Sequence, residues 1–500
     1  MTMPIFKRNL MDLADGYKVD HRRQYPDGTT RVQTNWTPRG SRVEGTTHVV
    51  NFGLQYVLQE WLTAVAGEWF AEPGGKMVDY WNKSIGAYLG PDNEVGSQHI
   101  SDLHDLQYLP LRFSALPEGT LVPLRVPTFI CENSDPSLED NFFWLPNYFE
   151  TLTSAESWLP STSATAAHRF RLMLERHAAE TGGNADFVKF QGHDFSMRGM
   201  QGIAAGEASG AGHALSFVGS DTRSAIPWIE HFYDVDRLLT MILVSVAATE
   251  HSVMCAGGKG DELETIRRII RKYPTGVLSV VSDTWDLWHV LTEILPQLKD
   301  EIMAREGVYV TRPDSGDPED ILLGDRLATP GSPAYRGVLD LLGETFGTVT
   351  NAAGYKALDP HVGTIYGDGI GYDRGDSILT RGAIQGWQST NEVFGLGSFH
   401  YTYVTRDTHG YAMKATWAEV DGEGHDLFKD PITDDGVKKS AKGRLAVAMG
   451  DDGDLRIVEQ ATPEQEAASL LRPVWENGQF LVRETFDEIR ARLWPQDAAA

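Results

Sequence analysis

The chain of 500 residues carries 70 acidic against 44 basic side chains, a formal net charge of −26, and 41% of its residues are hydrophobic. A surface this acidic disfavours nonspecific binding to nucleic acid or to an anionic membrane, so we predict neither as a partner. The length and apolar content predict a large core divided among two or more folding units. The two cysteines, Cys131 and Cys255, are too few for a disulfide framework, and we expect reduced thiols.

The sequence shows no sign of a secretory signal or a membrane span. The N-terminal stretch lacks a long apolar run. The most apolar run, Leu238–Ala248, is shorter than the roughly 20 residues that a membrane-spanning helix needs. We therefore expect a compact protein of the cytoplasm.

From about residue 185 onward, short β-rich runs alternate with amphipathic helical patterns. The predicted strands lie within 185–195, 213–222, 241–252, 276–284, 306–316, 362–369 and 391–398, and the predicted helices within 261–273, 284–298, 332–347 and 374–387. Thr284 and Ser332 are the expected N-caps of the second and third helices, and Pro333 suits the first turn. This alternation is typical of βαβ units and a parallel sheet.

Polar residues follow these predicted strands directly; they are Asp194, Asp221, His251, Asp283, Asp314 and Asp368. Such positions gather at one face of a parallel α/β barrel, and also at the carboxyl edge of an open sheet. About seven strands favour the barrel, so the predicted fold class is α/β with an irregular parallel barrel. The candidate functional residues are expected to converge at its mouth.

The sequence patterns at the two ends of the chain differ from the alternation of strands and helices in its middle. Residues 30–150 mix β-type runs with a helix, and the tail after residue 410 alternates β-type runs with Gly/Asp turns typical of antiparallel hairpins. We expect an accessory β-rich domain built from both ends. The predicted divisions are an N-terminal segment at 1–34, the accessory domain at 35–150 and 401–500 with a C-terminal helix, and the barrel at 151–400.

Several motifs suit a phosphorylated sugar. In "RPDSGDPED", Arg312 can bind phosphate bidentately. Asp314 can accept hydrogen bonds from ribose hydroxyls or bind Mg²⁺ through water. "GDG" at 367–369 allows close approach of the backbone to a ligand, and "FGLGS" at 394–398 can cradle a phosphate with its N–H groups. Each motif alone is also compatible with a simple turn or a surface salt bridge.

Two residues have competing interpretations. Asp221 can accept an amide N–H, or it can cap the helix that follows. His251 can act chemically, or it can be a buried histidine satisfied by hydrogen bonds. The lysines after residue 410 can line a polyphosphate entry or form a solvated face.

The motifs "DGYKVDHRRQYPDGTT", "HDFSMRG", "GSDT", "EHS", "SVVSD", "RPDSGDP", "YGDG" and "FKDPITDDG" occur in order along nearly the whole chain. Together they resemble the nicotinamide phosphoribosyltransferases, a family of type II phosphoribosyltransferases. The resemblance implies an irregular α/β barrel with a β-rich accessory domain, a homodimer with shared active sites, and transfer of phosphoribose from phosphoribosyl pyrophosphate to nicotinamide for NAD biosynthesis. It also implies Mg²⁺, held mainly by substrate phosphates and water, with Asp283 and Asp314 as candidate ligands.

The resemblance assigns site residues by their place in these motifs. Phe195 and the partner subunit's Tyr17 would stack on the pyridine ring, and Asp221 would accept the carboxamide N–H, with Ser279 and Arg198 close by. The residues implied for ribose, pyrophosphate and phosphates are Asp283, Arg312, Asp314, Gly367, Asp368, Gly397, Ser398, Arg406, Arg39, Lys414, Lys429 and Lys438. His251 matches the histidine that ATP phosphorylates in the family, and Glu250 is a candidate to orient it.

Some positions depart from the family pattern. Gly16 stands where Ser is common, Met197 stands where an aromatic is common, and the phosphate loop has fewer glycines. The loop before Lys438 gains a residue, so its register can differ by one.

Two alternatives stay open. A nicotinate phosphoribosyltransferase shares fold and reaction, although the Asp221 carboxylate would repel the carboxylate of nicotinate. A non-catalytic binding protein on the same scaffold is the other, although such a protein has no reason to retain the full set of catalytic residues.

Overall fold

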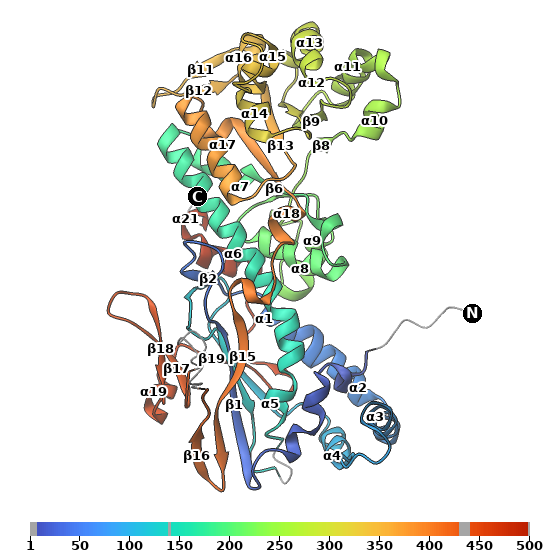
Figure 1. Ribbon diagram of the computed structural model, residues 1–500, viewed down its shortest axis with the longest axis vertical. Coiled ribbons are helices and arrows are strands. Elements are labelled where there is room, and N and C mark those ends of the chain that lie inside the picture. The colour runs from blue at the N-terminus through green and yellow to red at the C-terminus, as the bar shows by residue number, and fades with distance from the viewer. Residues whose placement is uncertain (1–7, 139–141, 430–440, 499–500) are drawn as a thin grey trace, which may run out of the picture. The chain divides into compact units, whose positions relative to one another are not determined.

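The computed structural model describes residues 8–138, 142–429 and 441–498, and these form two compact units (Figure 1). The barrel unit comprises Ser163–Trp228 and Asp236–Tyr403. The terminal unit comprises Met1–Thr162, Ile229–Val235 and Val404–Ala500. The domain boundaries expected from the sequence stay predictions. Within the described ranges, every helix is too short or too polar to cross a lipid bilayer.

A parallel sheet of seven strands forms the centre of the barrel unit, in the described residues, with the order β7-β6-β14-β13-β10-β9-β8. The strands are β6 Gly192–Asp194, β7 Gly219–Ser220, β8 Ala247–Ala248, β9 Leu278–Val281, β10 Tyr309–Arg312, β13 Val362–Tyr366 and β14 Glu392–Leu396. All ladder pairings in this sheet are parallel. Each predicted strand run contributes one of these strands, so the predicted α/β class is confirmed.

The sheet curls because the segment before β8 also contacts the opposite edge strand. Val244 forms a parallel bridge with Gly219 of β7, and three residues later Ala247 pairs with Leu278 of β9. One short segment thus touches both ends of the sheet. This arrangement turns the inward-facing side chains of the strands toward a common centre.

Helices and turns connect the strands of the barrel unit. They are η4 Ala185–Phe187, α7 Val188–Gln191, η5 Met197–Gly199, α8 Ile203–Ala214, α10 His251–Cys255, η6 Lys259–Asp261, α11 Glu262–Lys272, α12 Leu287–His289, η7 Val290–Ile294, α13 Leu295–Met303, α14 Pro318–Leu323, α15 Pro333–Arg336, α16 Val338–Phe346, α17 Tyr372–Ile384, η8 Ser389–Asn391 and α18 Ser398–Tyr401, with a ribbon of β11 Thr348–Thr350 and β12 Lys356–Leu358. Helices α6 Glu150–Thr181 and α9 Ala225–Tyr233 belong partly to each unit. Ile266, Ile269 and Ile270 of α11 are buried, as the amphipathic pattern predicts.

Two local predictions in the barrel unit are wrong. Residues 185–191 are helical rather than extended, and only Gly192–Asp194 form the strand, because a short apolar run does not distinguish a helix from a strand. Thr284 does not cap the next helix. Asp286 does so, accepting a hydrogen bond from the His289 N–H at 3.1 Å. The predicted Ser332 cap with Pro333 at the helix start is confirmed.

The terminal unit is built around an antiparallel sheet from both chain ends, ordered β16-β15-β1-β5-β3-β19-β20. Figure 1 shows β1 (Thr29–Pro38) beside β15 (Tyr411–Val420), which come from opposite ends of the chain. The other strands of this sheet are β3 Leu111–Ala115, β5 Phe129–Asn133, β16 Glu423–Asp426, β19 Arg472–Glu476 and β20 Gln479–Phe480. Asp421 and Gly422 both have positive φ, as a two-residue hairpin turn requires. The expected β-rich domain from both chain ends is therefore confirmed.

Smaller elements complete the terminal unit. They are η1 Leu10–Asp12, η2 Gly16–Arg23, β2 His48–Val50, α1 Leu54–Gln59, η3 Glu60–Val65, α2 Ala66–Ala71, α3 Gly74–Leu89, α4 Gln98–Leu106, β4 Leu121–Pro123, α5 Leu145–Tyr148, η9 Arg406–Thr408, β17 Leu445–Met449, β18 Leu455–Glu459, α19 Pro463–Ala467, α20 Phe486–Leu493 and α21 Pro495–Ala498. Strands β2 and β4 pair, as do β17 and β18. Cys131 is buried in β5 and Cys255 is exposed, and both are free thiols.

A buried carboxyl group links β13 and β14 of the barrel unit. The side chain of Glu392 is hydrogen-bonded to the Thr364 hydroxyl, and burial raises the pKa of Glu392 to about 8. The unfolded chain releases this proton near the ordinary carboxyl pKa, whereas the folded chain keeps it to about pH 8. Stability therefore falls as pH rises across this window, by about 1.4 kcal/mol for each pH unit from this one group.

Glu392→Gln mimics the protonated carboxyl and removes this titration. We expect the original chain to lose stability relative to Glu392→Gln as pH rises from about 5 to 8. The difference between their free energies of unfolding, measured by urea titration at each pH, therefore shifts in favour of the variant. A difference that stays constant with pH would contradict a raised pKa at Glu392.

Candidate functional site

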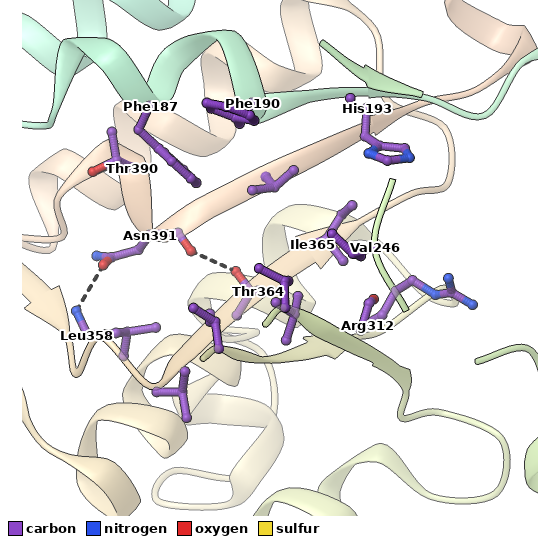
Figure 2. Close-up of a pocket in the computed structure, with 18 of the residues that line it drawn as sticks. Phe187, Phe190, His193, Val246, Arg312, Leu358, Thr364, Ile365, Thr390 and Asn391 are labelled. Carbon is purple, nitrogen blue, oxygen red and sulfur yellow. Dashed lines mark hydrogen bonds between the residues drawn. The ribbon is translucent and has the colours of Figure 1, made fainter. Parts of the chain in front are cut away.

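A cavity of about 390 Å³ lies inside the curled sheet. Alternate residues of β10, Val310 and Arg312, line it together with Val308 just before the strand, as expected where successive side chains point to opposite faces. Figure 2 shows His193 and Arg312 at one end and Phe187, Thr390 and Asn391 at the other. Because His193 and Arg312 lie at the carboxyl ends of β6 and β10, that end is the face where the sequence predicts the site.

Phe195 lies at this face on a platform of two glycines. Its N–H donates to the Leu396 carbonyl at 3.0 Å, which ties the turn after β6 to β14. A Cβ placed on Gly395 would stand 2.6 Å from ring carbons of Phe195 and 2.6 Å from the Gly367 Cα. The ring is half-buried and lines the cavity, so one face of a flat ligand can stack on it.

Asp221 follows β7, and its carboxylate belongs to the same face. Oδ1 accepts a hydrogen bond from Ser245 Oγ at 2.6 Å and lies 3.2 Å from His193 Nε2. Burial favours the neutral acid, but the hydrogen bonds from His193 and Ser245 and the charge of Arg312 outweigh it, so the pKa of Asp221 is lowered. Helix α9 begins only at Ala225, and the hydrogen bonds found for this carboxylate go to side chains, which suits ligand binding better than capping.

His251 begins α10 and faces two carboxylates. Its Nε2 lies 3.9 Å from Asp314 Oδ2 and 4.0 Å from Asp283 Oδ1, and its Nδ1 lies 3.2 Å from Thr284 Oγ1. The imidazole is half exposed, so the buried-histidine interpretation does not hold. Glu250, which the sequence suggested as its orienting partner, instead accepts a hydrogen bond from Ser252.

Some buried polar atoms at this face have no hydrogen-bond partner among the described residues. They are Arg312 Nε, Ser279 Oγ and Asp283 Oδ1. Arg312 donates through Nη2 to the Thr249 carbonyl at 2.6 Å, while Asp283 Oδ2 accepts from the Asp314 N–H at 3.0 Å and the Ser315 hydroxyl at 2.6 Å. Leaving buried polar groups unpaired costs free energy, so this cluster is arranged for a polar ligand.

The remaining predicted residues of the barrel unit lie on neighbouring loops. Gly367 and Asp368 follow β13, and a Cβ on Gly367 would stand 3.5 Å from Asp314 Oδ1. Arg198 is exposed in η5, next to Gly199, where a Cβ would overlap the Ser398 side chain. Thr402 Oγ1 also donates to the Gly199 carbonyl at 3.1 Å. The Arg198 turn and the Gly397–Ser398 loop therefore lie side by side.

The terminal unit holds the other predicted residues. Tyr17 is exposed, its hydroxyl donates to Asp15 Oδ2 at 3.3 Å, and its pKa is raised by partial burial and by the charges of Asp15 and Glu150. Glu150 Oε1 lies 3.5 Å from Lys414 Nζ. Arg39 donates to the Gly410 carbonyl, Arg406 pairs with Asp407, Lys429 is exposed, and Lys438 lies outside the described residues.

Magnesium fits this site only together with a ligand. No group of three His, Cys, Asp or Glu side chains suited to a metal occurs in residues 8–138, 142–429 and 441–498. Asp283 Oδ1, which has no hydrogen-bond partner among the described residues, and the exposed Asp314 carboxylate are hard oxygen donors. Mg²⁺ takes such donors in small number beside substrate phosphates. The donor set therefore fits a metal carried mainly by phosphates.

Sequence reasoning missed His193, Ser245 and Thr284 as members of the site. His193 directly precedes Asp194 at the end of β6, and Ser245 is a polar residue inside an apolar run before β8. Both positions are therefore weak indications, in the sequence, of a role at the site. Conversely, Asp194 is fully buried and accepts from the Ser196 N–H at 2.8 Å, which makes it a structural turn residue.

The chain matches two protein-family models. The model of the "Nicotinate phosphoribosyltransferase (NAPRTase) family" covers residues 190–479, and that of the "Nicotinamide phosphoribosyltransferase, N-terminal domain" covers residues 9–73. Among curated proteins, the nicotinamide phosphoribosyltransferase of Acinetobacter baylyi is 46% identical over 98% of both chains. That of Xanthomonas campestris is 33% identical over 97% of both.

Solved structures support the fold. A nicotinate-nucleotide pyrophosphorylase from Pyrococcus furiosus aligns with a TM-score of 0.58 at 15% identity, covering 99% of this chain and 98% of that one. The human nicotinic acid phosphoribosyltransferase aligns with a TM-score of 0.55 at 16% identity, covering 99% and 94%. With the barrel, the site at its carboxyl face and these full-length relatives, the chain belongs to the nicotinamide phosphoribosyltransferase family.

Proposed function

We propose that this chain transfers phosphoribose from phosphoribosyl pyrophosphate to nicotinamide, giving nicotinamide mononucleotide and pyrophosphate in NAD salvage. The family membership supports the reaction, and the ionised Asp221 beside the Phe195 ring is the observation that supports the substrate. A carboxylate that accepts hydrogen bonds recognises an amide N–H and repels a carboxylate.

Nicotinamide binds with its pyridine ring on Phe195 and its carboxamide N–H on Asp221. Tyr17 of the partner subunit covers the other ring face. Offset stacking adds about 0.5–1.5 kcal/mol for each ring pair beyond burial. Ser279, whose hydroxyl is buried without a partner among the described residues, offers the carboxamide a further hydrogen bond.

The phosphorylated sugar binds along the adjacent strand ends. Arg312, Asp314, Asp283 and the Gly367–Asp368 turn hold ribose and pyrophosphate, while Arg198, Gly397 and Ser398 take the 5′-phosphate together with Arg406. Arg39, Lys414, Lys429 and Lys438 supply further positive charge for the phosphates. Lys414 already compensates Glu150, so a bound phosphate competes with that carboxylate.

The reaction needs a nucleophile held in line with a departing pyrophosphate. Stacking and the Asp221 hydrogen bond orient the pyridine nitrogen toward C1′, and the C1′–O bond to pyrophosphate breaks as the C1′–N bond forms with inversion. Arg312 stabilises the negative charge that develops on the pyrophosphate oxygen. Mg²⁺, when bound, supplies additional charge neutralisation at the phosphates, and Asp283 and Asp314 would hold it.

ATP enters as a facultative co-substrate. The His251 side chain is half exposed, and its Nδ1 lies 3.2 Å from Thr284 Oγ1. Nε2 can therefore attack the γ-phosphorus of ATP, so that the Nε2–P bond forms as the bond to ADP breaks. Phosphohistidine 251 would raise substrate affinity by offering Mg²⁺ further phosphate oxygens beside the substrate pyrophosphate.

Nicotinate phosphoribosyltransfer is the alternative, and a parallel assay decides between them. With phosphoribosyl pyrophosphate and Mg²⁺, we expect nicotinamide mononucleotide to form faster than nicotinate mononucleotide, and ATP to increase the rate. Faster turnover of nicotinate would overturn the substrate assignment. Turnover of neither would favour a non-catalytic binding protein.

A homodimer with shared sites follows from the proposed role of Tyr17. Tyr17 is 64% exposed, and in the barrel unit Leu238 and Leu239 are 87% and 86% exposed. Exposed apolar residues of this size favour contacts with a second copy. We expect Tyr17→Ala and Asp314→Ala to be inactive alone. Mixing them after partial denaturation is expected to restore up to about a quarter of the activity per subunit, because about half of the reassembled dimers are heterodimers and each heterodimer contains one intact site of two. A complete lack of restored activity would contradict shared sites.

The expected cytoplasmic location stays a prediction.

A further inference from the structure

We propose that His193 and Ser245 are positioning residues that engage one oxygen of Asp221 and leave the other for the ligand, and thereby decide whether the site prefers a carboxamide or a carboxylate. The inference rests on the proposed function, in which Asp221 accepts the carboxamide N–H. It concerns how the preference is set, not whether the reaction occurs.

The hydrogen bonds found for the Asp221 carboxylate end on the same oxygen. Ser245 Oγ donates to Oδ1 at 2.6 Å, and His193 Nε2 lies 3.2 Å from the same atom. Among the described residues, no side-chain partner of Oδ2 is found. The two donors approach from β6 and from the segment before β8, which are the neighbours of β7 on both sides. The carboxylate therefore has a fixed plane and one free oxygen.

The His193 ring is itself held in place. A Cβ on Gly219 would stand 2.8 Å from His193 Nδ1 and 3.2 Å from the Gly192 carbonyl oxygen, so the imidazole lies directly over the glycine backbone of β7. On its other side, the ring centroid lies 4.7 Å from that of Phe195. His193 thus contacts both the proposed stacking ring and the proposed amide acceptor, and it couples their positions.

The charge around the carboxylate supports this role. The groups that face Asp221 are His193 from β6, Ser245 from the segment before β8 and Arg312 from β10, and each favours the ionised form. An ionised carboxylate with a donor-saturated Oδ1 offers only an acceptor at Oδ2. Nicotinamide has an N–H to give to that acceptor, whereas nicotinate has none and brings a second negative charge.

Ser245→Ala removes the shorter hydrogen bond without adding bulk. We expect kcat/KM for nicotinamide to fall about tenfold, mainly through KM, while kcat/KM for nicotinate stays equal or rises, so that the ratio of the two falls. The acid limb of the pH profile for nicotinamide is expected to move to higher pH, because a bond to the charged form is lost. Ser245→Thr keeps the hydroxyl and is expected to retain the ratio.

Matched controls separate positioning from general damage. Ser163→Ala removes a buried hydroxyl that bonds Ser209 in the same unit, and it is expected to leave the ratio and the pH profile unchanged. His193→Gln keeps an N–H donor on a side chain of different length, whereas His193→Phe has none. The ratio of kcat/KM for nicotinamide to that for nicotinate is expected to fall less in His193→Gln than in His193→Phe. Thermal melting of each variant shows whether it is folded.

A double-mutant cycle with Asp221→Asn tests whether Ser245 acts through Asp221. We expect Ser245→Ala to have little further effect on the ratio when it is combined with Asp221→Asn. An equal loss in both backgrounds, or an unchanged ratio and pH profile in Ser245→Ala while Asp221→Asn changes the ratio, would overturn this inference and leave the proposed function standing. Failure of the original chain to turn over nicotinamide would overturn both.

Discussion

Asp221→Asn is expected to lower kcat/KM for nicotinamide about 10- to 100-fold and to raise the relative turnover of nicotinate. A hydrogen bond to a charged acceptor contributes about 1.5–3 kcal/mol. The Asn side chain is neutral, so the variant loses this charged acceptor. The Asn side chain can also donate an N–H to the nicotinate carboxylate, which Asp221 repels. Steady-state kinetics with both substrates at saturating phosphoribosyl pyrophosphate measure the change.

The control for this variant is Asp452→Asn. Asp452 pairs with Arg456 at the tip of the β17–β18 hairpin, so its replacement removes one carboxylate in the terminal unit and leaves the barrel unit intact. Its substrate preference is expected to equal that of the original chain. If Asp221→Asn keeps the original preference, Asp221 is not the residue that recognises the amide.

Gly395→Ala is expected to damage both stability and activity. The new methyl group would stand 2.6 Å from the Gly367 Cα and 2.6 Å from the Phe195 ring, and a backbone atom cannot yield as a flexible side chain does. Overpacking of this kind costs about 1–3 kcal/mol. Because the clash moves both Phe195 and the Gly367 turn, we also expect kcat/KM to fall about 100-fold, as an ångström-scale misplacement of a reacting group does.

Gly363→Ala provides the comparison on the neighbouring strand. A Cβ at Gly363 would meet Val308 at 3.7 Å and Val310 at 4.0 Å, which are ordinary contacts. Urea titration and kinetics of both variants separate the two effects, and Gly363→Ala is expected to remain close to the original chain in both. Equal behaviour of the two variants would show that the Gly395 platform does not position Phe195.

The sequence was sufficient to predict which polar residues follow the strands of the barrel. Asp221, His251, Asp283, Asp314 and Asp368 were predicted to follow strands, and each lies just after β7, β8, β9, β10 or β13. This works because turn residues after a β-rich run are a local signal, and parallel pairing then brings such ends to one face. The β-rich sheet from both chain ends was predictable for the same reason, from alternation and Gly/Asp turns.

Contacts between distant segments were not predictable. Ser245 and His193 reach Asp221 across two strand pairings, and nothing in their local sequence indicates which carboxylate they bind. The glycine platform under Phe195 depends on Gly395, which lies in β14, and on Gly367, which lies just after β13. The helix at Val188–Gln191 was missed because its apolar run is too short to show a period.

The structure shows the surroundings of two residues that depart from the family pattern, Gly16 and Met197. At Gly16, the Tyr88 hydroxyl occupies the place where a Cβ would stand, so a glycine beside Tyr17 accommodates that ring. Met197 lies over Gly206 of α8, and its sulfur accepts from the Ser224 hydroxyl at 3.8 Å. Both residues border predicted ligand-binding positions without replacing them.

A crystal structure with bound nicotinamide mononucleotide tests the central claim most directly. We predict that the pyridine ring is stacked on Phe195, that the carboxamide nitrogen lies within hydrogen-bond distance of Asp221 Oδ2, and that the phosphate lies beside Arg198 and Ser398. A nucleotide bound away from the barrel mouth, or a carboxamide turned away from Asp221, would contradict it.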